Sequence, residues 1–157
     1  MGTRLRRVVE DAAAEFQQAD ADRASRQPAP GKWSAKEIIG HLIDSASNNH
    51  ARFVTGQVRD DLVFNGYDQE SWVNVQRYDL ADWHELVALW RAYNLHLAHV
   101  IDTAPADIRN APRVRHNYDR VAFTQVPTSE PATLGYLMDD YVVHLEHHLA
   151  QVRALLR

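Results

Sequence analysis

Two histidines near the C-terminus have the spacing of metal ligands. His144 and His148 are four residues apart in the segment HLEHHLAQ, and residues four apart on a helix project from one face. Two neutral imidazoles side by side can hold one divalent cation such as zinc. Histidines that only make hydrogen bonds within a core can share this spacing, so the pair alone leaves both interpretations open.

The place of the pair on its helix favours the metal interpretation. Both rings lie on or beside the apolar stripe of the segment that begins near residue 133, where a neighbouring helix must pack. Asp140 and Gln151 lie on the same flank as His144. We expect either of them to orient a ligand histidine by a hydrogen bond to its second ring nitrogen.

A third ligand must come from another helix, and His41 is the best candidate. It lies at the edge of an apolar arc in the segment IIGHLID, and Ser45 and Asn49 continue the polar flank. Gly40 beside it would let another group approach the helix closely. The catalytic residues are not identified by the sequence: Asn49, Asp68 and Glu70 are candidates for a general base or a hydrogen-bond partner, and the two acids are also read as ordinary loop residues.

The remaining histidines are expected to be packing or surface residues. His96 and His99 lie on the edge and outer side of their helix, and His50 is expected to pack. His84 and His116 are expected on the surface or in loops.

Four stretches with the periodicity of amphipathic helices must position these side chains. The first stretch covers residues 3–26. The second begins at Ser34, the third near Asp79 or Asp82, and the fourth near Thr133. Ser34 and Glu37 form a capping box, which marks the second start clearly. Four helices with one apolar stripe each predict an all-α four-helix bundle in a single domain, residues 1–157.

The connections after the second and third helices are long. Residues 58–79 can cross the bundle from end to end, and Asn65-Gly66 marks a turn within them. Residues 104–132 are rich in Pro, Asn and Asp, and 121–126 are expected to be extended. Loops this long in a compact domain usually carry function, so we expect the substrate to be chosen there.

Composition excludes several classes of protein. The chain of 157 residues has a net charge of −4 and no large basic cluster, so no nucleic-acid partner is expected. Its apolar runs are too short to cross a membrane and no signal peptide is visible, which predicts a cytoplasmic protein. Cysteine is absent, so any metal must be held by nitrogen and oxygen, and any thiol must come from outside.

Four segments together resemble the DinB/YfiT-like metalloenzyme superfamily. The most specific are GKWSAKEIIGHLID (31–44) and DYVVHLEHHLAQ (140–151). NGYDQESWV (65–73) and LWRAYNLH (89–96) are similar to one branch of it. The resemblance therefore extends over nearly the whole chain.

The resemblance implies a fold and a metal site. The fold is a four-helix bundle of up-down-down-up topology, often in a homodimer. One histidine of the second helix and the H-x-x-x-H pair of the fourth hold zinc or nickel, and these positions correspond to His41, His144 and His148. Some members use a low-molecular-weight thiol, and others are regarded as hydrolases.

Two functional hypotheses follow from these observations. The first is a metal-dependent enzyme that activates water or a low-molecular-weight thiol against a small-molecule substrate, in hydrolase or S-transferase chemistry. The second is a non-catalytic bundle, metal-binding or metal-free, that dimerises and binds a small molecule.

Overall fold

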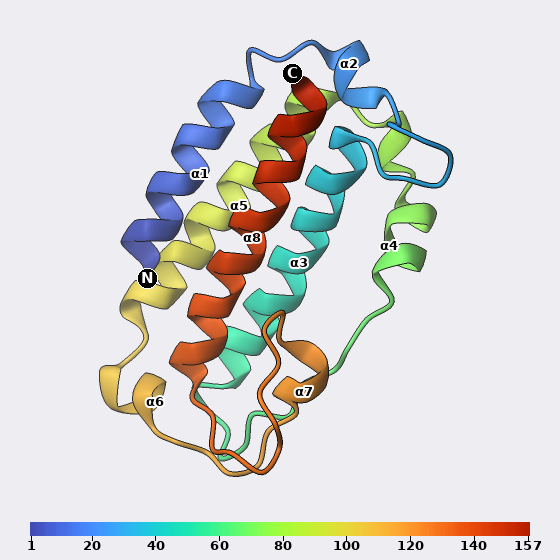
Figure 1. Cartoon of the computed structure of the whole chain (residues 1–157). Helices are drawn as coiled ribbons and strands as arrows, with labels where there is room; N and C mark the ends of the chain where they lie inside the picture. Colours follow the sequence, from blue (N-terminus) through green and yellow to red (C-terminus); the bar gives the residue numbers. More distant parts are fainter.

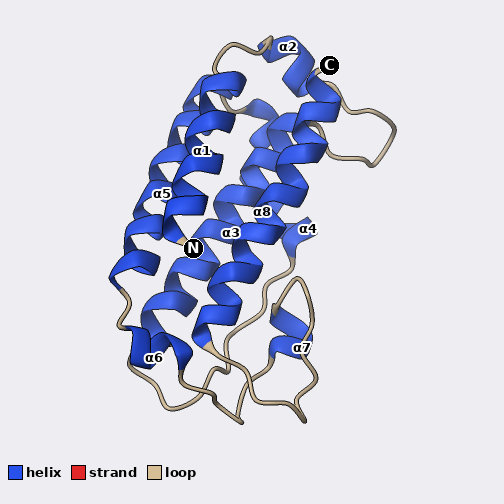
Figure 2. Cartoon of the chain, turned by 60° about the vertical axis from the view of Figure 1, so that its left-hand side comes forward, coloured by secondary structure: helices blue, strands red, loops and turns tan.

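Four long helices form a bundle with up-down-down-up topology. The computed structural model describes residues 1–157, and the long helices are α1 (Gly2–Phe16), α3 (Ala35–Thr55), α5 (Trp83–Thr103) and α8 (Leu134–Leu156). Figure 1 shows α1 and α8 running in one direction and α3 and α5 in the other. The all-α fold expected from the sequence is confirmed, and no strand is present (Figure 2).

The first predicted helix is wrong in its extent. Residues 3–26 do not form one helix, because α1 ends at Phe16 and a separate short helix, α2 (Ala21–Ser25), follows. Asp20 causes the restart: its side chain accepts a hydrogen bond from the backbone N–H of Arg23, which caps α2. An aspartate in the middle of a helical pattern favours such a cap over continued helix.

The starts of the other three long helices are set by local capping. Ser34 and Glu37 form the predicted capping box at α3. Asp82, rather than Asp79, caps α5 by accepting from the Glu85 N–H, and Thr133 caps α8. Each cap satisfies a backbone donor that a helix would otherwise leave without a partner.

The two long connections contain short helices and pair with each other. The first connection contains α4 (Gln69–Gln76) and the 3-10 helix η1 (Tyr78–Leu80), and the second contains α6 (Ala106–Asn110) and α7 (Tyr118–Val121). Residues 121–126 are not a strand, because Val121 ends α7 and a bend follows.

A side chain fastens one connection to the other. The Asn117 amide accepts from the Phe64 N–H and donates to the Phe64 carbonyl, as a neighbouring strand would. The two connections therefore support each other at the end of the bundle where α3 ends and α8 begins (Figure 1).

One continuous core joins the four long helices. Thirty-six buried hydrophobic residues form a single cluster, with Trp83, Trp90 and Phe16 among its largest members. The Trp83 indole N–H donates to the Phe16 carbonyl at 2.9 Å, so the polar atom of this buried ring is satisfied. None of the helices has both the length and the hydrophobicity that a transmembrane span requires.

Close approach at Gly40 brings the first long connection against α3. A Cβ atom built on Gly40 would lie 2.1 Å from Cδ2 of Tyr78, so the tyrosine ring occupies the space that a side chain would need. The Tyr78 hydroxyl donates to the buried Asp44 carboxylate at 2.7 Å. The glycine next to His41 thus serves the packing of η1 on α3.

We predict that Gly40→Ala destabilises the protein by about 1–3 kcal/mol, because the new methyl group displaces the Tyr78 ring. In a helix without this contact the same change would stabilise by up to about 1 kcal/mol, so the sign of the effect is informative. Urea unfolding measures this change in the free energy of unfolding. Gly66→Ala is the control, since no atom lies within 4 Å of a Cβ built there; an unchanged or higher midpoint for Gly40→Ala would contradict this packing.

Candidate metal centre

Three histidine rings converge where α3 packs against α8. His41 comes from α3, and His144 and His148 come from successive turns of α8. One ring nitrogen from each lies within 4.8 Å of the other two, and Nε2 of His41 is 3.4 Å from Nε2 of His144. Residues more than 100 positions apart in sequence are therefore brought into one cluster by antiparallel packing of two helices.

Burial keeps these rings unprotonated. His41 is only 1% exposed, and burial together with the neighbouring His148 lowers its pKa to about 4. Burial and the three neighbouring histidines lower the pKa of His144 to about 3. The pKa of His148 is also lowered, chiefly by burial. At neutral pH each ring therefore presents a lone pair, which is the form that binds a metal.

The second nitrogen of two rings is held by a polar neighbour. Nδ1 of His148 donates to Oε1 of Gln151 at 2.8 Å, which leaves Nε2 of His148 as the free lone pair. The Ser45 hydroxyl lies 3.5 Å from Nδ1 of His144. The hydrogen bond expected between Gln151 and a ligand histidine is thus present.

The donor set fits a divalent transition metal. Neutral imidazoles suit zinc and nickel, and three of them leave coordination positions for other molecules. Facing lone pairs without a cation between them would repel, and Nδ1 of His41 is buried without any hydrogen-bond partner. A polar cluster with these features is better satisfied with a cation than without one.

Asp140 does not orient a histidine. Its two carboxylate oxygens accept from the backbone N–H groups of Phe123 and Thr124, at 2.7 and 2.8 Å. These bonds hold the Phe123 ring beside His144, with ring centroids 5.3 Å apart. Asp140 therefore shapes the second long connection next to the site, a role that helical geometry alone could not show.

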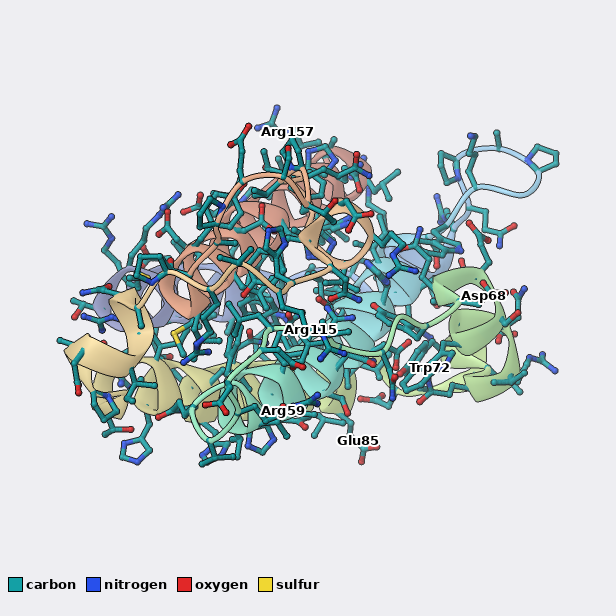
Figure 3. All side chains as sticks on the ribbon, turned by 90° about the horizontal axis from the view of Figure 1, so that it is seen from below. Arg59, Asp68, Trp72, Glu85, Arg115 and Arg157 are labelled. Carbon is teal, nitrogen blue, oxygen red and sulfur yellow. The ribbon has the colours of Figure 1, made fainter.

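The other candidates have different positions. Asn49 is buried and donates to the Ser45 carbonyl at 2.9 Å, so it reaches His144 only through Ser45. Asp68 caps α4 and lies at the outer edge of the molecule, on the same helix as Trp72 (Figure 3). Glu70 is exposed and lies beside Gln151 in a separate shallow hollow.

A polar cavity of about 220 Å³ opens beside the cluster. Helices α3 and α8 form one side of it, and both long connections complete it. His41 and His144 lie at its wall together with Tyr67 and Phe123. Burial raises the pKa of Tyr67 to about 12, so its hydroxyl stays protonated in the cavity.

The remaining histidines lie outside the cluster. His50 and His96 form a separate pair between α3 and α5, with ring centroids 4.9 Å apart. His116 was expected on the surface or in a loop; it lies in the second connection but is buried, where its Nε2 is 2.7 Å from the Glu130 carbonyl.

Sequence reasoning did not identify Arg52 and Tyr67 as cavity residues. Arg52 follows Ser45 and Asn49 on the same flank of α3, and this spacing could have revealed it. Tyr67 comes from an irregular segment, so no periodicity signals its direction.

Comparisons with known proteins agree with this fold. The family model described as the DinB superfamily matches residues 3–152. A solved structure, that of YfiT from Bacillus subtilis, superimposes with a TM-score of 0.75 at 21% identity, covering 98% of this chain and 85% of that one. YfiT is described as having an "unusual four-helix bundle topology", and the likeness shows that this chain shares the fold.

Two curated relatives carry the name "putative metal-dependent hydrolase". YfiT of Bacillus subtilis is 24% identical over 154 residues, which are 96% of this chain and 81% of the relative. A protein of Oceanobacillus iheyensis is 22% identical over 151 residues, 96% of this chain and 79% of the relative.

We predict that the metal-free protein loses stability as the pH falls from about 6.5 to 4. In this range the unfolded chain binds protons at His41 and His144 that the folded chain does not bind, so the free energy of unfolding rises with pH and falls on acidification. Each ring contributes up to about 3 kcal/mol. Urea unfolding at several pH values in the presence of a chelator measures the slope.

The control compares two substitutions. His144→Gln is expected to flatten the slope because it removes one of the two titrating rings. His84→Gln, on the exposed side of α5, is expected to leave it unchanged. Equal slopes in all three proteins would show that the cluster is not buried in its neutral form.

Proposed function

The chain belongs to the DinB superfamily, and from its three-histidine centre we propose that it is a divalent-metal-dependent enzyme acting on a small-molecule substrate. His41, His144 and His148 would hold the metal, zinc or nickel. The convergence of three neutral ring nitrogens, one on a buried and two on half-buried histidines, beside a polar cavity carries this proposal. The names of the relatives support it independently.

The metal would supply a Lewis acid that makes water or a low-molecular-weight thiol a better nucleophile at neutral pH. The protein's own groups prepare the site for that chemistry. Gln151 fixes the proton of His148 on Nδ1, and thereby the lone pair on Nε2. Trp33 packs on His41 at 5.1 Å between ring centroids and Phe123 packs on His144, so apolar faces shield the cluster from bulk water.

We expect the nucleophile to come from outside the chain. Cysteine is absent, and the chain places no carboxylate against the histidines as an obvious general base. Water gives a hydrolase, as the names of the relatives suggest, and a low-molecular-weight thiol gives an S-transferase. The cavity beside the cluster would admit either nucleophile together with a small substrate.

We predict that the purified protein, incubated with zinc or nickel and then desalted, retains about one metal ion per chain. His148→Ala is expected to lose this stoichiometry because two imidazoles hold a divalent ion much less firmly than three. Elemental analysis measures it. His84→Ala is a matched control: this histidine is exposed on α5 and does not belong to the three-ring cluster.

A metal-free wild-type protein after this treatment would contradict the proposal and favour a non-catalytic bundle. For the loaded protein, ester and amide substrates are screened with and without an added thiol. A rate that requires the thiol identifies the transferase, and a thiol-independent rate identifies the hydrolase. Either rate is expected to fall at least about a hundredfold in His148→Ala.

A further inference from the structure

Arg52 is a buried cation without an acidic partner. Its side chain lines the cavity beside the histidines, and the residue is only 7% exposed. Arg4 and Arg91 each bind a glutamate, whereas Arg52 forms no ion pair with any Asp or Glu. A buried charge normally requires an opposite charge, because moving it out of water costs several kcal/mol.

Only neutral oxygens satisfy the Arg52 guanidinium. Nη2 donates to the Asn65 carbonyl at 3.0 Å, and Nη1 makes two long contacts of 3.4 Å, with the Val121 carbonyl and with Oδ1 of Asn49. Arginine has five N–H donors, so the donor on Nε and one on Nη2 have no acceptor in the chain. Burial lowers the pKa of Arg52 but leaves the group charged at neutral pH.

Arg52 lies at the wall of the same cavity as the histidines. His41, Ser45, Asn49 and Arg52 follow one another at helical spacings along one flank of α3, and all four line the cavity. The cavity therefore has two histidines of the cluster, His41 and His144, in one part of its wall and a guanidinium in another.

Two other charged groups face this cavity. Arg120 lies 3.8 Å from the Asp119 carboxylate and so has its own partner. Asp140 uses both oxygens on the backbone N–H groups of Phe123 and Thr124, and it does not form an ion pair with Arg52. The protein thus supplies no ion-pair partner for Arg52.

We propose that Arg52 binds a carboxylate of the substrate while the three-histidine centre acts on another part of the same molecule. The planar fork of arginine matches a carboxylate through two parallel hydrogen bonds. A neutral analogue would leave the buried charge without a counterion and would bind more weakly. This inference rests on the proposed function for the reaction, but the anion site itself is independent of the metal.

The test uses matched acids and amides. The cobalt-loaded protein is titrated with ω-mercaptoalkanoates of increasing chain length and with their neutral amides, and visible absorption reports thiolate binding at the metal. We expect the wild type to bind the acid of best-fitting length at least about tenfold more tightly than its amide, as for a charge-assisted hydrogen bond. Arg52→Gln should abolish this ratio by weakening the acid alone.

Two further variants complete the test. Arg113→Gln is the matched control, because Arg113 also donates to backbone carbonyls, of Gly56 and Ile108, but does not line the cavity; it should keep the wild-type ratio. Arg52→Lys keeps the positive charge but not the planar guanidinium, and it should give an acid-to-amide affinity ratio between those of the wild type and Arg52→Gln. This variant tests the inference if Arg52→Gln does not fold. A ratio near one in the wild type, or an unchanged ratio in Arg52→Gln, would overturn the inference.

A metal-free arm separates this inference from the proposed function. Propionate should raise the melting temperature of the metal-free wild type more than propionamide does, and Arg52→Gln should remove this difference. If cobalt does not bind but propionate stabilises through Arg52, the proposed function fails and the anion site stands. If cobalt binds but neither the thiol titration nor the propionate effect depends on Arg52, the anion site fails and the metal centre stands.

Discussion

Three imidazole rings held close together are unfavourable unless their lone pairs face a positive charge, and this constraint applies where α3 packs against α8. His41 projects from one helix, and His144 and His148 project from two turns of the other. Burial holds the rings neutral, and Gln151 fixes the proton of one of them. The antiparallel packing of these two helices therefore brings the three rings together beside the cavity.

The topology explains why the connections belong to the site. Because α3 and α5 run in the same direction, the chain must return along the bundle between them, and α4 lies on this return (Figure 1). The same connection places Tyr67 at the cavity wall and η1 against α3. Gly40 accommodates the crossing by leaving room for the Tyr78 ring. The second connection is fastened by Asp140 from α8 and by Asn117, which pairs with Phe64 of the first. The two connections, although irregular in sequence, are thus held in place as walls of the cavity.

Two different groups on α3 line the cavity: His41 of the histidine cluster and, further along the helix, Arg52. The histidine end of the cavity is suited to a metal and a nucleophile, and its Arg52 end is suited to an anionic group. A substrate that spans both would be held in one orientation, with its reactive bond directed toward the histidines. With the proposed roles of the histidines and Arg52, a small cavity would select substrates by charge as well as by size.

The sequence by itself determined the helices, their caps and the identity of the clustered histidines, because capping, periodicity and helical spacing are local properties. It also led to the family and thereby to the up-down-down-up order. One local signal was missed, because the cap that Asp20 makes divides the first helix. The other failures occurred where distant segments decide the outcome: Asp140 bonds to the second connection, and Arg52 has no acid beside it in the cavity. The homodimer and the thiol stay predictions. Only the tertiary structure decided which polar groups share a space, since that depends on how the long connections fold back on α3 and α8, and no local pattern encodes this.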